Sequence, residues 1–190
     1  DFPRQPQIGP YWCHRCSKTC QPVREAFKFL RRYSLDTVKR IEEFSDKRTN
    51  ASVSVYHGDS RKITLPQIDG VITSPPYVGL IDYHEQHVYA YHLLGLKDRR
   101  DKEIGSATNG SSQKAKRQYQ EDMATVFHNI LQYMPTGGRL IVVANDKANV
   151  YDELAVLLGV DVEGIVQRHV NRWRSYPGEF YESIFIWRKP

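Results

Sequence analysis

The sequence predicts an α/β fold with a mostly parallel sheet, preceded by a small cysteine-containing helical segment. Three observations support this expectation. From residue 53 onward, short apolar runs of strand type alternate with segments of helical periodicity, as in strands joined by crossover helices. The last two strand-type runs have no helical segment between them, which predicts an antiparallel hairpin at one edge of the sheet. The first 50 residues combine clustered cysteines with helical spacing and contain no convincing pair of strands.

The composition excludes several classes of protein. The 190 residues are 40% hydrophobic and 26% charged, which is typical of one soluble globular domain with a small appendage. We expect no secretory signal, and no membrane span because no apolar run approaches ~18 residues. The three cysteines are clustered near the start and do not form the framework of a secreted disulfide scaffold, so we expect a cytoplasmic location.

The positive charge is concentrated in the first quarter of the chain. The net charge is +5, and residues 1–50 alone hold 11 Lys and Arg against 6 Asp and Glu. Such a segment suits a polyanionic partner such as nucleic acid. A solvated basic helical face explains the same charges equally well.

The first region is predicted to contain two helices and a linker. Pro22 suits the first turn of one helix, and Ser34 suits the N-cap of a second. Residues 45–52 have the composition of a linker. The sequence therefore predicts two regions, a basic cysteine-containing segment over 1–50 and an α/β region over 51–190.

The second region supplies the elements of the sheet. The expected strands cover residues 53–57, 69–73, 139–144, 162–170 and 181–188. The expected helices cover residues 82–94, 119–134 and 150–158. Residues 97–118, rich in charged residues, Gly and Ser, are expected to form a mobile loop.

The most informative motif is Thr73-Ser74-Pro75-Pro76-Tyr77, at the end of the short buried strand predicted over 69–73. In open α/β sheets, ligands bind at the carboxyl ends of the strands. The two prolines fix the backbone and have no N–H, so the carbonyls there need donors from elsewhere. Acceptors beside an aromatic ring suit a flat group that carries an NH2. A proline-rich turn that only ends a strand explains the motif equally well.

These residues resemble the SAM-dependent methyltransferases that act on exocyclic amino groups of nucleobases. Residues 74–77 are similar to their catalytic Ser/Asp/Asn-Pro-Pro-aromatic motif, and residues 58–60 to their acidic motif after a strand. Residues 135–138 are similar to the Pro-x-Gly-Gly turn before the family's fifth strand. The resemblance covers residues 53–190. It implies a Rossmann-like class I methyltransferase sheet, of which this chain holds only the C-terminal strands.

The resemblance implies methyl transfer from SAM to a base that is flipped out of the stack. The Ser74 side chain and the Pro75 carbonyl would accept hydrogen bonds from the amino group, and Tyr77 would stack on the base. Because the proton leaves only after the nitrogen becomes cationic, catalysis would rest on positioning and electrostatics. The residues expected near the cofactor are Asp59, Ser60 and Thr73.

The residue before the two prolines indicates the target. Serine at this position, here Ser74, is typical of N4-cytosine enzymes, whereas Asp or Asn is typical of N6-adenine and RNA guanine-N2 enzymes. The sequence therefore favours cytosine N4 in DNA, as in restriction-modification enzymes. N6-adenine in DNA and guanine N2 in RNA are the alternatives within the family. A non-catalytic nucleic-acid-binding or assembly subunit with a decayed methyltransferase fold is a third interpretation.

The family's glycine-rich SAM loop has no counterpart in this sequence. The chain has 12 glycines but no Gly-x-Gly. Without the strands that carry this loop, edges of the sheet would be open. We therefore predict one half of a methyltransferase, which needs a complementary half on an upstream segment or on a second polypeptide. A homo-oligomer is the alternative.

Two smaller groups of residues point to a metal and to nucleic acid. Cys13, Cys16 and Cys20 lie near zinc-ligand spacing, but zinc takes four ligands, and reduced thiols are the alternative. Basic residues beside aromatic ones suit contacts to a nucleic-acid backbone, with a solvated hairpin as the alternative. These candidates are Lys114, Lys116, Arg117, Arg172 and Arg174.

Overall fold

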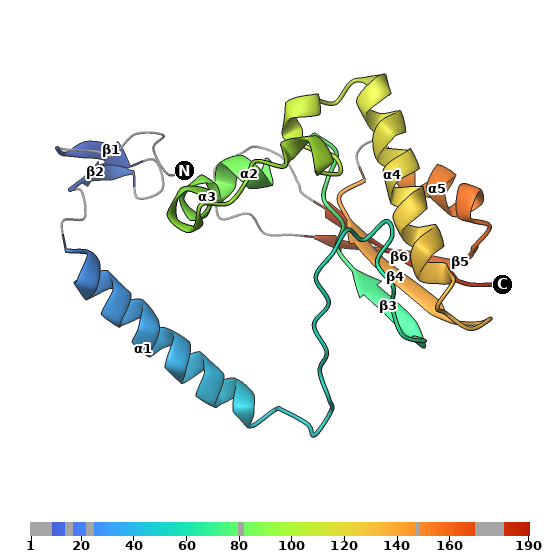
Figure 1. Cartoon of the computed structure of the whole chain (residues 1–190), viewed down its shortest axis with the longest axis horizontal. Helices are drawn as coiled ribbons and strands as arrows, with labels where there is room; N and C mark the ends of the chain where they lie inside the picture. Colours follow the sequence, from blue (N-terminus) through green and yellow to red (C-terminus); the bar gives the residue numbers. More distant parts are fainter. Residues whose placement is uncertain (1–8, 14–16, 22–24, 80–81, 147–148, 170–180) are drawn as a thin grey trace. The chain divides into compact units, whose positions relative to one another are not determined.

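The computed structural model divides into two compact units, residues 1–56 and 57–190. It describes residues 9–13, 17–21, 25–79, 82–146, 149–169 and 181–190. The first unit contains a two-stranded antiparallel hairpin, formed by β1 (Tyr11–Cys13) and β2 (Lys18–Cys20), and the helix α1 (Ala26–Ser45) (Figure 1). Within the described residues, no helix has both the length and the apolar character needed to span a membrane.

The prediction of two helices in the first unit is wrong. Ser34 lies in the middle of α1 and caps nothing, and Pro22 lies outside the described residues. The reason is that no Gly or Pro interrupts residues 26–45, so helix propagation past Ser34 costs little once the first turn has formed. No side chain of α1 is buried, and its large apolar side chains are exposed except for Phe29, which is half-buried.

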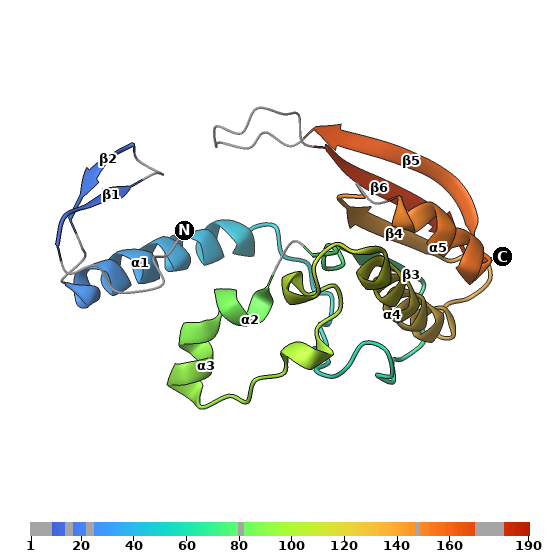
Figure 2. The ribbon, with the colours of Figure 1, turned by 90° about the horizontal axis from the view of Figure 1, so that it is seen from above.

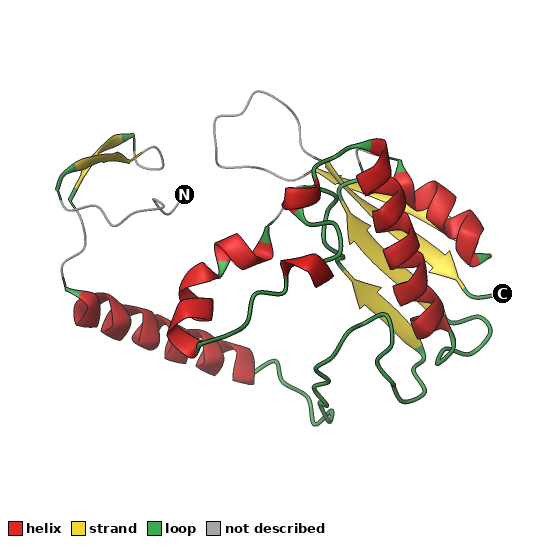
Figure 3. Cartoon of the chain, turned by 45° about the horizontal axis from the view of Figure 1, so that its top comes forward, coloured by secondary structure: helices red, strands yellow, loops and turns green. Residues whose placement is uncertain are grey.

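The strands of the second unit, yellow in Figure 3, lie side by side in one sheet. This sheet is four-stranded and has the order β3-β4-β6-β5. The strands are β3 (Gly70–Thr73), β4 (Arg139–Ala144), β5 (Asp161–His169) and β6 (Tyr181–Arg188). β3 and β4 are parallel, and β6 runs antiparallel to both β4 and β5. This arrangement confirms the predicted α/β class and its antiparallel edge hairpin, with β6 as the inner strand of that hairpin. The expectation of a mostly parallel sheet is wrong for the described strands, because only β3 and β4 pair in parallel.

Helices α4 (Gln113–Leu131) and α5 (Val150–Leu158) cover one face of the sheet (Figure 2). The core lies between this face and the helices. Alternate residues of β4 are buried there, and Phe127 of α4 meets Trp187 of β6 edge to face, with ring centroids 5.8 Å apart. The apolar periodicity of residues 139–144 and 150–158 therefore predicted both elements with the correct bounds.

The predicted strand over residues 53–57 is wrong. These residues belong to no ladder, and Val53 and Val55 are 82% and 90% exposed. A strand needs a partner for its backbone hydrogen bonds, and no described strand pairs with this segment. The neighbouring prediction, that residues 69–73 form a buried strand, is wrong in its burial. Ile72 of β3 is 79% exposed, because its side chain lies on the face of the sheet opposite α4 and α5 and β3 is the edge strand of the described sheet.

The segment between the motif and α4 contains more structure than the sequence predicts. The expected helix over 82–94 is two short ones, α2 (Tyr83–Gln86) and α3 (Val88–Leu94), and the Asp82 carboxylate caps α2 by accepting a bond from the Glu85 amide (2.7 Å). The expected loop over 97–118 contains the short 3-10 helices η1 (Arg100–Lys102) and η2 (Ala107–Asn109), and α4 begins inside it. Ser106 is buried, so part of this segment packs against the core.

Candidate active site

The Ser74-Pro75-Pro76-Tyr77 motif lies at the edge of the sheet where the parallel strands end. β3 ends at Thr73 and β4 ends at Ala144, and Thr73 is paired with Val142, two residues before the end of β4. Because β6 is antiparallel to β4, it begins at this same edge with Tyr181. This is the edge at which α/β sheets bind ligands.

The motif's aromatic ring is held by a residue of β6. The Tyr77 hydroxyl donates to a Glu182 carboxylate oxygen (3.0 Å), and the other Glu182 oxygen accepts a bond from Arg168 of β5. Burial raises the pKa of Tyr77. A hydrogen bond with the Ser74 side chain opposes this shift and the bond to Glu182 adds to it. Tyr77 is therefore a neutral donor at physiological pH, half-buried between the motif and the hairpin.

The motif's backbone is held by two buried tyrosines. The Tyr119 hydroxyl, on α4, donates to the Pro76 carbonyl at 2.8 Å, and it lies 2.6 Å from the Tyr151 hydroxyl on α5. The Tyr151 ring stacks on Phe185, with centroids 5.0 Å apart. Asp146 caps the start of α5 by accepting bonds from the amides of Val150 and Tyr151. Sequence analysis identified Tyr119 only as part of a helical apolar pattern, because nothing local links it to the motif.

Two glycines let the segment after α3 approach the motif closely. The Gly79 amide donates to the Gly105 carbonyl (2.9 Å), and both residues have positive φ, +62° and +69°. A Cβ atom on Gly105 would lie 2.9 Å from the Tyr119 ring and 3.5 Å from the Tyr77 carbonyl oxygen. This position therefore requires glycine for both its conformation and its packing.

Gly105→Ala is expected to lower the free energy of unfolding by about 2–4 kcal/mol, since strain at positive φ adds to overpacking against Tyr119. Gly95→Ala is the matched control. Gly95 has a similar φ of +61°, and a Cβ atom there would meet nothing within 4 Å. We expect this control to lose only about 1–2 kcal/mol. Urea unfolding of both variants measures the difference, and equal losses would show that Gly105 does not pack closely against the tyrosine.

Of the three predicted cofactor residues, Asp59 and Ser60 lie in one turn, and Thr73 ends β3. Both Asp59 carboxylate oxygens accept bonds from Arg61 (3.0 and 3.1 Å), which lowers the pKa of Asp59. Arg61 also bonds Asp122 of α4 (3.0 Å), so it anchors this turn on the helix. The Ser60 carbonyl accepts a bond from the Asn129 amide, further along α4. Of the three residues, Thr73 alone directly precedes the motif.

The predicted nucleic-acid residues lie partly at this edge. Lys114, Lys116 and Arg117 are in the first turns of α4 rather than in a loop, close in sequence to Tyr119. They therefore lie at the helix end that contacts the motif. The other two candidates, Arg172 and Arg174, lie outside the described residues.

The structure describes two of the three clustered cysteines. Cys13 and Cys20 lie on opposite strands of the β1-β2 hairpin, and Cys16 lies outside the described residues. In the part of the chain that the structure describes, no group of three or more His, Cys, Asp or Glu residues could hold a metal ion. The zinc interpretation therefore has no support in the structure.

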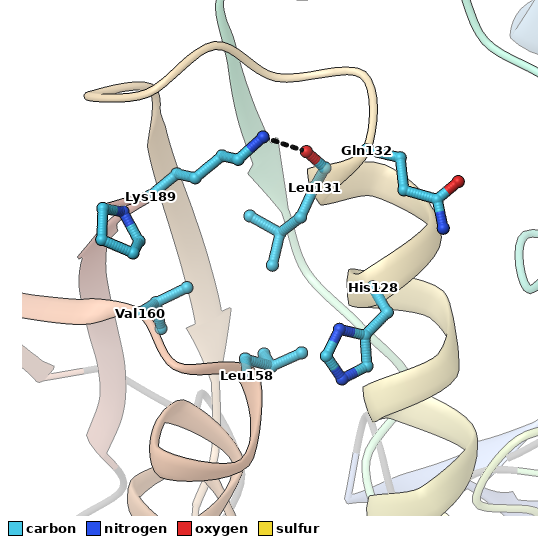
Figure 4. A pocket seen from close by; sticks show the side chains of 7 residues that line it. His128, Leu131, Gln132, Leu158, Val160 and Lys189 are labelled. Carbon is cyan, nitrogen blue, oxygen red and sulfur yellow. Dashed lines mark hydrogen bonds between the residues drawn. The ribbon is translucent and has the colours of Figure 1, made fainter.

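A hollow of about 410 Å³ lies at the opposite end of α4 from the motif (Figure 4). Its walls include Leu131 and Leu158, which end α4 and α5. The Lys189 ammonium group in its wall donates to the carbonyls of Leu131 (2.8 Å) and Met134 (2.6 Å). This lysine therefore completes the C-terminus of α4, and the hollow takes no part in the candidate active site.

The chain has a relative among proteins of known activity. It is 36% identical over 199 residues to the Type II methyltransferase M.MjaII of Methanocaldococcus jannaschii, and the alignment covers 96% of this chain and 38% of that protein. The chain thus spans less than half the length of the relative. No family model matches the sequence.

The chain also has likenesses among solved structures. The candidate DNA modification methylase TTHA0409 of Thermus thermophilus, complexed with S-adenosyl-L-methionine, is 18% identical with a TM-score of 0.44, covering 70% of this chain and 54% of that one. Its selenomethionine derivative is 19% identical with a TM-score of 0.42, covering 70% of this chain and 51% of that one.

Proposed function

We propose that this chain is the catalytic-motif part of a SAM-dependent DNA methyltransferase that modifies the N4 amino group of cytosine. The observation that carries the proposal is the placement of Ser74-Pro75-Pro76-Tyr77 at the ligand-binding edge of a parallel strand pair. Its support from known proteins is the 36% identity to a Type II methyltransferase over nearly the whole chain. The serine before the prolines favours cytosine, and the likeness to a Type II methyltransferase supports our proposal of a restriction-modification setting.

In this proposal the motif orients the target amino group. Ser74 is exposed at the end of β3, whereas Pro75 is buried, and no donor among the described residues reaches the Pro75 carbonyl. In this proposal both oxygens accept bonds from an NH2 group, which directs the nitrogen lone pair toward the methyl donor. The Tyr77 ring, held at its hydroxyl by Glu182, is the stacking surface for the base. SAM supplies the methyl group when it is bound.

The described residues do not fit a complete SAM site. Asp59 is the acidic candidate, and Arg61 occupies both of its oxygens. The sequence also has no Gly-x-Gly loop that would let the backbone approach the cofactor. We therefore propose that Thr73 and the motif border the cofactor, and that most of its contacts come from a complementary half.

The sheet offers a surface for that half. Ile72 of β3, Ile141 of β4 and Ile186 of β6 are register partners, so they form a row on the face opposite α4 and α5. Ile72 is 79% exposed, and the other two are half-buried. Among the described strands, β3 has a neighbour on one side only, and its other edge adjoins this row. Parallel strands in α/β folds are covered on both faces, so we propose that the complementary half pairs with β3 and covers these isoleucines.

The DNA backbone is proposed to lie along the start of α4. Lys114 and Arg117 are exposed there, and Lys116 is half-buried. Their charges would neutralise phosphates beside the flipped base, whereas the motif would contact the base itself. This arrangement separates positioning contacts from the contacts that read the target.

A methyl-transfer assay tests the proposed function. The chain, combined with its complementary half, is incubated with labelled SAM and either DNA or RNA, and the modified nucleoside is identified after digestion. N4-methylcytosine in DNA is the expected product. N6-methyladenine in DNA would overturn the choice of base, and label in RNA alone would overturn the choice of polymer. DNA binding without any product would favour the non-catalytic subunit.

A further inference from the structure

Tyr119 and Tyr151 form a directed chain of hydrogen bonds that ends on the motif. A tyrosine hydroxyl has one proton to donate. Tyr119 gives its proton to the Pro76 carbonyl (2.8 Å), so its oxygen must accept the bond from Tyr151 (2.6 Å). Both residues are almost completely buried, at 1% and 3% exposure. Hydrogen bonds arranged in series in such surroundings strengthen one another.

The final acceptor in this series of hydrogen bonds is the Pro76 carbonyl, the second of two adjacent proline carbonyls. Neither proline has an N–H, so the motif cannot hold its own backbone through local hydrogen bonds. The bond from Tyr119 satisfies the Pro76 carbonyl and fixes the plane of the peptide that joins Pro76 to Tyr77. The Pro75 carbonyl, one residue earlier, is left without a donor in the described part of the chain. Of the two carbonyls, therefore, only that of Pro76 has a donor among the described residues.

We propose that Tyr119 is a positioning residue for methyl transfer. Its hydroxyl holds the Pro76 carbonyl in place through a hydrogen bond, here called the lock, and the Pro75 carbonyl remains for the target amino group. Tyr151 supports it by fixing the direction of the Tyr119 hydroxyl. This inference rests on the proposed function. It adds a residue from α4 and one from α5 to a site that sequence analysis confined to residues next to the strand ends.

The buried surroundings of Tyr119 and Tyr151 keep both hydroxyl groups protonated, so both remain hydrogen-bond donors. Burial raises the pKa of Tyr119 to about 12, an effect that its bond with Tyr151 partly opposes. The pKa of Tyr151 is also raised, chiefly by burial. Both hydroxyls therefore keep their protons over the whole physiological range, so the lock does not depend on pH. The Tyr119 ring also lies close to Gly105, whose carbonyl accepts the bond from the Gly79 amide.

Amide hydrogen exchange on the chain itself tests the lock without any methylation. Tyr119→Phe keeps the ring and removes the hydroxyl, leaving the half-buried Pro76 carbonyl without its donor. We expect exchange at the Gly79 amide to accelerate about tenfold or more, with the β4 amides unchanged. Tyr133→Phe, in the turn after α4, is the matched control, since no hydrogen bond of its hydroxyl is described. Equal exchange at Gly79 in the two variants would overturn the proposal.

Steady-state kinetics of the complete methyltransferase gives the second test. We expect Tyr119→Phe to lower kcat about tenfold to a hundredfold while the KM for SAM stays the same, because the lock acts on the target amino group. Tyr151→Phe should have a smaller effect in the same direction. An unchanged kcat with a lower unfolding temperature would overturn the positioning role and leave a structural one. If the wild-type protein transfers no methyl group, the proposed function fails, and the exchange experiment still decides whether the lock exists.

Discussion

Tyr77→Ala is expected to lower the kcat of methyl transfer to DNA about tenfold to a hundredfold, because the target base loses its stacking surface. Tyr77→Phe keeps the ring and loses only the bond to Glu182, so we expect a loss of less than about tenfold. Single-turnover kinetics at saturating SAM, with the complementary half present, measures both variants. Comparing the two variants separates the effect of the Tyr77 ring on kcat from the effect of its hydroxyl.

The controls for Tyr77 address folding and the anchor. Tyr133→Phe should retain wild-type kcat, because this residue lies away from the motif edge. Glu182→Gln keeps an acceptor for the Tyr77 hydroxyl, so it should resemble Tyr77→Phe or be milder. Thermal unfolding of each variant shows whether the fold is intact. Methylation by Tyr77→Ala at the wild-type rate would contradict the stacking role.

Ile72→Lys is expected to abolish assembly with the complementary half while leaving the chain itself folded. Ile72 is 79% exposed, so the substitution should change the free energy of unfolding of the isolated chain by less than about 0.5 kcal/mol. In the assembled protein the lysine would be buried without a partner, at a cost of several kcal/mol, or about a hundredfold or more in the dissociation constant. Native mass spectrometry of the mixture measures the assembly.

Val156→Lys is the matched control for this experiment. Val156 is 82% exposed on α5, the helix that covers the other face of the sheet. We expect this variant to assemble with the complementary half as well as the wild-type chain does, and the assembly to take up SAM. If Ile72→Lys assembles equally well, the complementary half does not cover the isoleucine row.

Elements with a strong local signal were predicted well. Residues 139–144 are a continuous apolar run next to a Gly-Gly turn, and they form β4 with the expected bounds. The prediction over 53–57 used the same type of signal and is wrong, because β structure depends on a partner strand. The prediction of a helix start at Ser34 is wrong for a different reason. A residue that suits an N-cap does not interrupt a helix when both flanking segments favour helix.

The candidate site was predictable only where its residues are contiguous. Residues 74–77 combine rare backbone chemistry with an aromatic ring in one short run, so they are visible in the sequence. Tyr119 is remote from the motif, as its bond to Pro76 spans 43 positions, and in the sequence it has only the helical spacing of a core residue. Glu182 lies still further along the chain, and its role depends on β6 being antiparallel to β4.

By itself, the sequence determined the α/β class, the closing hairpin and the position of the motif at the end of a strand. These features follow from local periodicity and from the inability of proline to continue a ladder. Only the tertiary structure decided that the motif is held by Tyr119 and Glu182, that Asp59 is bound to Arg61, and that Ile72 is exposed. The physical reason is that hydrogen bonds and burial between distant segments arise from packing, which local sequence preferences do not encode.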